Sequence, residues 1–143
     1  MRQILFRGKR IDNGEWVYGG FYKEPYSERC LIISWNSFGF GFNEEIKVIP
    51  ETVGQYTGLK DKNRKQIFEG DIVKGRHWTD KMYTDSSVYH LFRVDWSKKS
   101  GLITFVDSPT FTGSLSIHDF ADFDEVEVVG NTYDRPDLLK VIE

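Results

Sequence analysis

The chain has 143 residues and a formal net charge of −3, from 22 acidic and 19 basic residues. This length suffices for one domain, or two very small ones, with a hydrophobic core. The acidic balance argues against a globally basic nucleic-acid-binding protein, although a local basic patch is compatible with it. Aromatic residues make up 15% of the chain, which is too many for a disordered protein.

Cysteine content and hydropathy narrow the class of protein further. Cys30 is the single cysteine, so neither an intramolecular disulfide nor a cysteine-based zinc site can form. The apolar run at residues 4–6 is too short for a signal peptide. No stretch approaches the roughly 20 apolar residues that a membrane span needs. We therefore expect a soluble protein of the cytoplasm that does not enter a membrane.

The first third of the chain consists of short β-rich runs separated by turn residues. Residues 4–8 form the first predicted strand, and the Asn13-Gly14 step after it favours a hairpin. Residues 16–22 form the next strand, in which a glycine pair indicates a bulge or a close backbone contact. Residues 30–35 are apolar on both faces, which predicts a buried strand. Along residues 45–49 polar and apolar residues alternate with a period of two, as in a half-buried strand, and Pro50 ends this strand.

The rest of the chain repeats this pattern with longer polar segments. Residues 60–65 form a polar loop in which Asn63 suits a turn position with positive φ. Residues 66–74 resemble the first strands of a small barrel, and residues 76–87 are a polar, irregular segment that we expect to be mobile. Further strands are predicted at 88–96, 102–106 and 125–129, with short helical segments at 117–124 and from Pro136 onward.

These elements predict a mainly β fold with one or two short helices. We expect an N-terminal antiparallel β element over residues 1–50 and a small SH3-type barrel over residues 51–143, in the C-terminal part. The best boundary between them lies within residues 50–65. Turn signals at this spacing favour a compact barrel over a parallel sheet.

Several motifs along the chain form a recognisable pattern when they are taken together. They are FRGK at 6–9, WVYG at 16–19, VIPETVGQYTGLKD at 48–61, IFEGDIV at 67–73, EVVGN at 127–131 and DLL at 137–139. With these motifs the chain resembles the YopX-like family of phage and prophage proteins. The resemblance implies an SH3-type barrel built around the EGDIV motif and a phage or prophage origin, but no established biochemical activity. One departure is Arg64, where this family often has glycine after asparagine, and this departure costs turn flexibility.

The Glu69-Gly70-Asp71 motif has a structural interpretation. Gly70 permits a tight backbone path, which predicts a constrained conformation with positive φ, and Asp71 can accept hydrogen bonds from turn amides. The flanking apolar residues are predicted to lie in the core. These are Phe68, Ile72 and Val73. In the same way Asn131 can cap the final turn.

Catalytic and metal-binding patterns are weak. An acidic cluster could hold a hard cation, but its spacing fits no calcium loop, so a solvated acidic edge is the preferred interpretation. Its members are Asp119, Asp122, Asp124, Glu125 and Glu127. The three histidines lack metal-ligand spacing, and His90 is interpreted as a strand-surface residue. Cys30 is interpreted as a small core residue, and Ser114 lacks a nucleophile elbow. We therefore expect no catalytic residue, cofactor or bound metal.

Two groups of residues suggest binding surfaces, one for nucleic acid and one for a protein partner. A basic surface with a stacking aromatic residue could bind nucleic acid; it comprises Lys62, Arg64, Lys65, Lys74, Arg76 and Trp78. A glycine-rich loop with Phe38, Phe40 and Phe42 could meet a protein partner, since aromatic residues are enriched at interface cores. The leading hypothesis is a non-enzymatic module that binds a protein partner or its own copies. The alternative is a nucleic-acid-binding small barrel, and a weaker third option is a metal-dependent enzyme that uses the acidic cluster.

Overall fold

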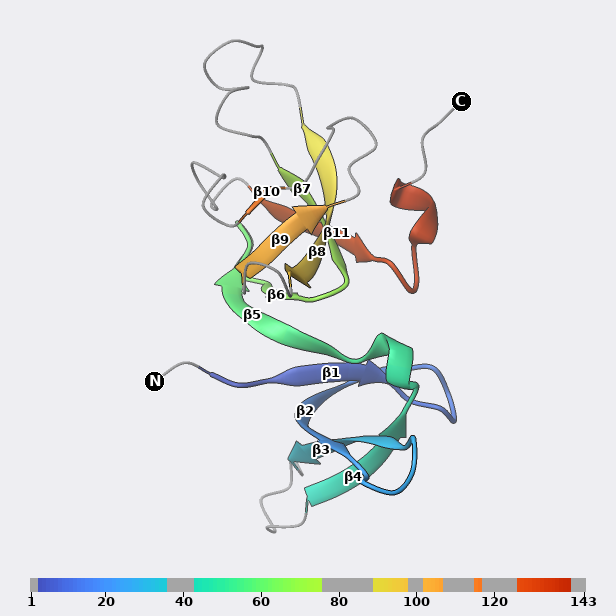
Figure 1. Ribbon diagram of the computed structural model, residues 1–143. Coiled ribbons are helices and arrows are strands. Elements are labelled where there is room, and N and C mark those ends of the chain that lie inside the picture. Colours follow the sequence, from blue (N-terminus) through green and yellow to red (C-terminus); the bar gives the residue numbers. More distant parts are fainter. Residues whose placement is uncertain are drawn as a thin grey trace. The chain divides into compact units, whose positions relative to one another are not determined.

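A computed structural model describes residues 3–35, 43–75, 89–97, 102–106, 115–116 and 126–139. Antiparallel strands dominate this part of the chain, and short 3₁₀ helices are its only helical elements, so the predicted mainly β class is confirmed (Figure 1). The chain folds into two compact units, Met1–Gly58 and Leu59–Glu143. The division falls within residues 50–65.

The first unit contains five strands of a six-stranded sheet, in the order β4-β3-β2-β1-β5, and neighbouring strands among these five pair antiparallel. The strands are β1 (Phe6–Lys9), β2 (Trp16–Lys23), β3 (Cys30–Trp35), β4 (Asn43–Val48) and β5 (Gly54–Lys60), and the 3₁₀ helix η1 (Pro50–Thr52) precedes β5. β5 continues past Gly58 into the second unit. The predicted hairpin between β1 and β2 is present, with a turn closed by Gly14 N donating to Arg10 O at 3.0 Å.

One face of this sheet forms the core of the first unit. Alternation along the strands places Cys30, Ile32, Ile46 and Val48 on that face, all buried. Four partly buried side chains pack against them, namely Phe6, Val17, Phe21 and Val53. Cys30 is therefore a core residue, as its position in an apolar strand predicts.

The sheet curls so that the end of β4 lies beside the end of β1. Ile49 N donates to Lys9 O at 2.8 Å, and Ile11 N donates to Lys47 O at 3.1 Å. The hydroxyl of Thr52 reinforces this junction, because it accepts from Lys9 N at 2.9 Å and donates to Ile49 O at 2.6 Å. The curl fixes the β1–β2 loop against β4.

The second unit contains a five-stranded antiparallel sheet in the order β10-β9-β8-β7-β11. Its strands are β7 (Asp71–Gly75), β8 (His90–Ser97), β9 (Leu102–Val106), β10 (Leu115–Ser116) and β11 (Glu127–Asn131), while β6 (Gln66–Phe68) follows β5 in the first sheet's order. Among the described strands no pairing joins β10 to β11. The sheet is thus open in this part of the chain, and closure into an SH3-type barrel is not confirmed.

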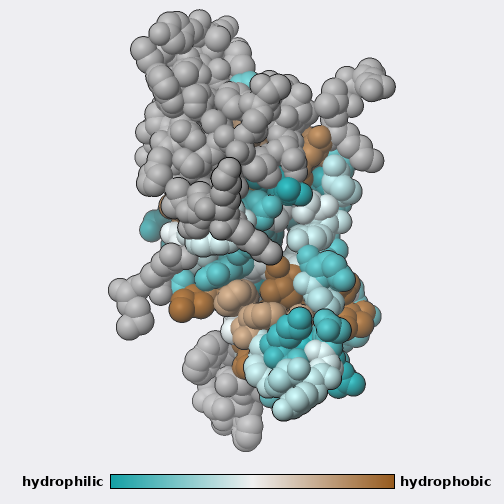
Figure 2. Space-filling model, in the orientation of Figure 1, coloured by the Kyte–Doolittle hydropathy of each residue, from teal (hydrophilic) through white to brown (hydrophobic). Residues whose placement is uncertain are grey.

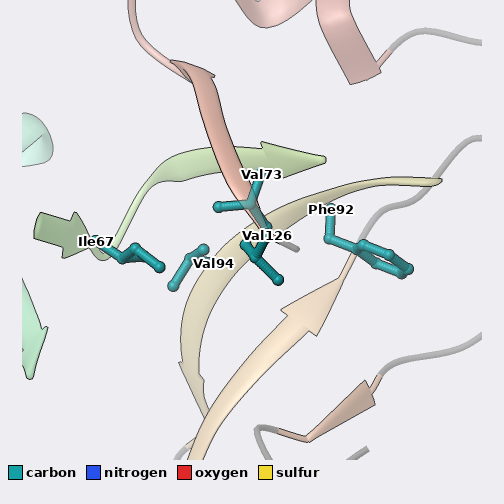
Figure 3. Packing of buried hydrophobic residues seen from close by; sticks show 5 residues of the cluster. All are labelled: Ile67, Val73, Phe92, Val94 and Val126. Atoms are coloured by element: carbon teal, nitrogen blue, oxygen red, sulfur yellow. The ribbon is translucent and has the colours of Figure 1, made fainter. Parts of the chain in front are cut away.

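Ile67, Val73, Phe92, Val94 and Val126 converge in the core of the second unit (Figure 3). The predicted core residues Phe68, Ile72 and Val73 are 2%, 0% and 0% exposed, so this prediction is confirmed.

The interpretation of His90 as a strand-surface residue is wrong. His90 is buried, and its ring meets Phe92 edge-on with 6.0 Å between centroids. The alternation of β8 explains this, because residues 90, 92 and 94 share the face that packs into the core.

A turn capped by Asn131 follows β11 near the end of the described residues. Asn131 Oδ1 accepts from Tyr133 N at 3.0 Å and from Asp134 N at 2.9 Å, as the capping prediction requires. The 3₁₀ helix η4 (Pro136–Leu139) follows, where the sequence predicts a half-turn of helix.

Gly70 has the positive φ that the sequence predicts, at +88°. The turn is held by Gly70 N donating to Val94 O at 2.8 Å and by Phe68 N donating to the buried carboxylate of Asp71 at 2.8 Å. A Cβ atom at Gly70 would lie 2.9 Å from Cε2 of Tyr133. Both the backbone and the space around it therefore favour glycine.

Replacing Gly70 by valine is expected to lower the free energy of unfolding by about 2 kcal/mol, because a β-branched residue resists positive φ. Urea unfolding measures the loss. A variant that unfolds at the same urea concentration as the parent would contradict this account of the motif.

Candidate functional site

Many of the residues that the sequence singles out lie outside the described residues. They are Phe38, Phe40 and Phe42 of the proposed partner surface, Arg76 and Trp78 of the basic surface, His77 and His118, Ser114, and the acidic residues Asp119, Asp122, Asp124 and Glu125. The remaining candidates can be placed.

The polar loop between β5 and β6 is organised by Asp61, which is 6% exposed. Its Oδ1 accepts from Asn63 N at 2.8 Å and Lys65 N at 2.9 Å, and its Oδ2 accepts from Val128 N at 3.0 Å. Lys62 N also donates to Val126 O at 2.9 Å. These bonds fix the loop on β11 and leave its basic side chains exposed. Those side chains are Lys62, Arg64 and Lys65, and Lys60 at the end of β5 is exposed beside them.

The turn position with positive φ in this loop is Arg64, at φ 66°, rather than the predicted Asn63. Asn63 and Lys65 both donate to Asp61, and these two bonds place the left-handed residue between them. An arginine in this conformation is strained, since the Cβ atom crowds the backbone.

Replacing Arg64 by glycine is expected to stabilise the protein by about 0.5 kcal/mol. Relief of left-handed strain gains about 1–2 kcal/mol, and the greater chain entropy of glycine offsets about 0.5–1 kcal/mol of it. Thermal unfolding of the Arg64→Gly variant measures the balance, with Arg64→Ala as the matched control that removes the side chain and keeps the strain. Equal melting temperatures for the glycine and alanine variants would argue against strain at this position.

The predicted basic surface is only partly assembled by the described residues. Lys62, Arg64 and Lys65 share one loop, whereas Lys74 lies on β7 with its Nζ 4.7 Å from the ring centroid of Tyr89. Lys62 Nζ lies 3.2 Å from Glu127 Oε2, so one of the charges is compensated. Within the described ranges no group of His, Cys, Asp and Glu could hold a metal ion.

A second surface, which the sequence interpretation did not single out, lies on β1 and β2. The register pairs Arg7 with Tyr18 and Lys9 with Trp16, so the four side chains share one face of the sheet. The guanidinium of Arg7 lies 4.6 Å from the ring centroid of Trp16, and Lys9 Nζ lies 5.7 Å from it. Contacts of this kind are cation–π interactions.

Tyr22 extends this face further along β2. Tyr18 and Tyr22 are each 47% exposed, and the opposite face of the same strand carries the core residues Val17 and Phe21. We call the set Arg7, Lys9, Trp16, Tyr18 and Tyr22 the β1–β2 outer face; Arg7 itself is only 5% exposed and contacts the ring of Trp16. The sequence signal for it is the two-residue period of its aromatic residues, read together with the hairpin.

Two hollows flank Ile11 in the first unit. The first, which we call the Ile11 cavity, has a volume of about 440 Å³ and an almost wholly apolar wall. It is lined by Ile11, Ser27, Glu28, Arg29, Cys30, Lys47, Val48 and Pro50. The second has a volume of about 280 Å³ and lies between Arg10–Asp12 and the residues 44–47 of β4.

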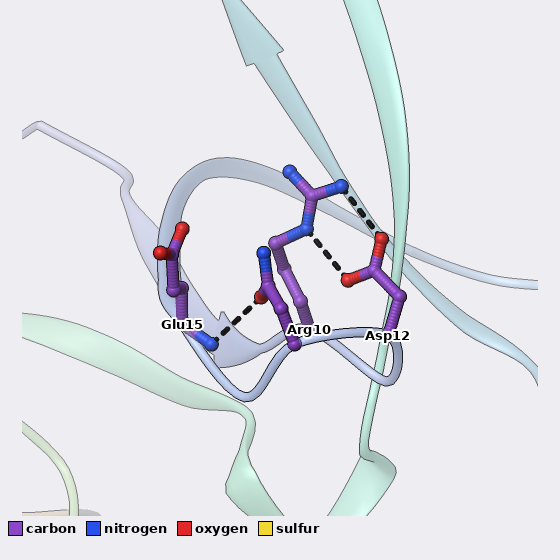
Figure 4. A network of polar contacts seen from close by, with 4 residues as sticks. Arg10, Asp12 and Glu15 are labelled. Atoms are coloured by element: carbon purple, nitrogen blue, oxygen red, sulfur yellow. Dashed lines mark hydrogen bonds and ion pairs between the residues drawn. The ribbon is translucent and has the colours of Figure 1, made fainter.

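An ion pair in the β1–β2 loop forms one wall of the smaller hollow (Figure 4). Arg10 donates to both carboxylate oxygens of Asp12, at 2.9 and 2.8 Å. These hydrogen bonds lower the pKa of Asp12 below its ordinary value. Glu15 N donates to Asn13 Oδ1 at 2.9 Å and completes the turn. The loop that carries Ile11 is thereby ordered at both ends.

Hydrophobic residues on the visible described surface occur in separate groups among polar ones (Figure 2). No described helix has the length and apolar character needed to cross a membrane.

Comparison with known proteins agrees with the motif pattern. A family model described as YopX protein matches residues 5–140. No curated protein matches the chain. Among solved structures, the crystal structure of protein EF1440 from Enterococcus faecalis is similar, with a TM-score of 0.52 and 20% sequence identity over 98% of this chain and 100% of that one. At this identity the likeness concerns the fold alone.

Proposed function

The chain belongs to the YopX protein family, and from this premise we propose that it is a phage- or prophage-encoded accessory protein that binds a protein partner in the bacterial cytoplasm. We propose that it catalyses no reaction itself. The observation that supports partner binding is the β1–β2 outer face.

This face has the composition of an interface core. Tryptophan, tyrosine and arginine are the residues enriched at the energetically dominant positions of protein interfaces. Trp16 is half-buried, and its contacts with Arg7 and Lys9 hold it in one position. Binding would then order few additional side chains, which lowers the entropic cost of association.

The experiment replaces both exposed tyrosines. We expect the Tyr18→Ala/Tyr22→Ala variant to lose at least about tenfold in partner affinity, since hot-spot truncations cost about 2 kcal/mol or more. Tyr26→Ala is the matched control, because Tyr26 is 100% exposed and lies in the β2–β3 loop, outside this face.

The partner is obtained by capture from phage-infected host lysate, and self-association is followed by light scattering of the purified chain. Circular dichroism melting verifies that each variant is folded. Partner binding that is equally strong in the parent and in the double tyrosine variant would contradict the assignment to this face.

A second candidate function is nucleic-acid binding by the loop between β5 and β6, supported by its three exposed basic side chains and by exposed Lys60 at the end of β5. In that case each phosphate contact contributes about −0.9 to the log–log salt slope on duplex DNA. Arg64→Ala/Lys65→Ala would weaken binding and flatten the slope by up to about two contacts. Absence of binding at low salt would eliminate this function.

For the second unit we retain the proposal of an SH3-type barrel. Support comes from its antiparallel strand order and from the tight turn at Gly70 between β6 and β7. A solution structure that includes residues 107–125 would test the closure.

A further inference from the structure

The Ile11 cavity is built where the curled sheet closes on the β1–β2 loop. Cys30 and Val48, which are 6% and 0% exposed, contribute to its wall from the adjoining ends of β3 and β4, where residues of either strand face can line it. Ile11 and Pro50 add apolar surface from the loop and from η1. The hydrogen bond from Ile11 N to Lys47 O fixes the loop at this place. A volume of about 440 Å³ lies within the usual range of small-molecule sites.

The charged residues of the lining leave an excess of positive charge. Glu28 has a side chain that is 94% exposed, and its Oε2 lies 3.5 Å from Lys23 Nζ. Arg29 and Lys47 form no ion pair with any described residue. Because Lys47 pairs with Leu31 in the register, Arg29 lies diagonally across the strand pair from Lys47. Long side chains can span such a separation, so both cations could approach one anionic group.

The apolar wall indicates what kind of ligand fits. An extended peptide would bring polar amides into the cavity at every residue, and a wall almost without polar atoms would leave them without hydrogen bonds. A molecule with an apolar body and a single polar end avoids this penalty. We propose that the Ile11 cavity binds a small amphipathic carboxylate, with its apolar body on the cavity wall and its carboxylate at Arg29 and Lys47.

This inference is independent of the proposed partner binding, and two probes with matched chains test it. Decanoate carries the carboxylate, and 1-decanol has the same chain length without the charge. We expect decanoate to bind about three- to tenfold more tightly than decanol, since exposed ion pairs contribute modestly. Bound decanoate should also slow alkylation of Cys30, the single cysteine, by iodoacetamide.

Variants separate the two parts of the ligand. Arg29→Gln/Lys47→Gln should abolish the preference for decanoate, whereas Lys60→Gln/Lys65→Gln, a matched pair of exposed lysines in the second unit, should retain it. Ile11→Asp should weaken both probes. Tyr18→Ala/Tyr22→Ala should bind decanoate like the parent, which distinguishes failure of this site from failure of the partner face.

Three results would overturn the proposal. They are equal affinity for the two probes, a preference that survives in the double glutamine variant, and the absence of both binding and protection of Cys30. The last result, combined with loss of partner capture in the glutamine variant, would assign the cavity to a macromolecular partner instead.

Discussion

Replacing Gly19 by alanine is expected to unfold a large fraction of the first unit, whereas the same replacement at Gly20 is tolerated. A Cβ atom at Gly19 would overlap the carbonyl oxygen of Ile33 and lie 2.8 Å from its carbonyl carbon. These are backbone atoms of β3, so they cannot rotate away as a side chain could. A Cβ atom at Gly20 would have no heavy atom within 4 Å.

The close approach follows from the path of β2. Residues 16–19 of this strand pair with β1, and residues 20–23 pair with β3. Gly19 lies at the change of partner, where β3 crosses close to the backbone. Overpacking usually costs about 1–3 kcal/mol, and a clash with backbone is expected at the upper end, about 3 kcal/mol or more.

Urea unfolding of the two alanine variants tests this account. Gly20→Ala should unfold within about 1 kcal/mol of the parent, because a glycine in a strand is itself slightly unfavourable. Identical unfolding midpoints for the two variants would show that β3 does not approach Gly19 in solution. The comparison is well matched, since the two residues are adjacent and differ only in what faces them.

Local features of the sequence predict the elements of this fold well. The Asn13-Gly14 turn, the buried strand that begins at Cys30 and the positive φ of Gly70 each depend on a few consecutive residues. The glycine pair in β2 indicated a close backbone contact, but which of the two glycines makes it depends on the position of β3. That position is set by pairing with another segment, and a single sequence does not reveal it.

The candidate sites depend on contacts between distant residues and were harder to predict. Ile11 meets Lys47 only because the sheet curls, and this contact defines the Ile11 cavity. The β1–β2 outer face needs the hairpin register before Arg7 and Trp16 can be placed together. The burial of His90 is decided by the core beneath one face of β8, and the sequence of the strand alone does not reveal which face is covered.

Asp61 is the clearest case of a long-range role, and its replacement by alanine is expected to be strongly destabilising. In the sequence it is the single carboxylate of a basic loop, residues 60–65. In the fold it accepts three backbone hydrogen bonds, one of them from Val128, which is 67 positions away. Removing a charged acceptor leaves its hydrogen-bond donors without a partner. Each buried donor left in this way lowers the free energy of unfolding by about 1–3 kcal/mol.

We therefore expect Asp61→Ala to lower the free energy of unfolding by about 3 kcal/mol, because all three donors lose their acceptor together. Asp61→Asn keeps one acceptor oxygen and should be intermediate. Asp12→Ala is the control, since that exposed carboxylate is bound by the side chain of Arg10 and supports no strand. It should melt close to the parent.

Hydrogen exchange shows where in the second unit the replacement of Asp61 acts, in addition to how strongly it destabilises. The amide of Val128 donates to Asp61 on the edge of β11, on the side of the strand that β7 does not cover. In the alanine variant this amide should exchange faster relative to those in the centre of the sheet, such as Phe92, because an edge strand that has lost its lateral bond opens locally. An unchanged ratio of exchange rates at Val128 and Phe92 would mean that Asp61 does not hold the loop on β11. The basic side chains of that loop would then be free to rearrange, and any binding surface they form would have to be ordered by the ligand itself.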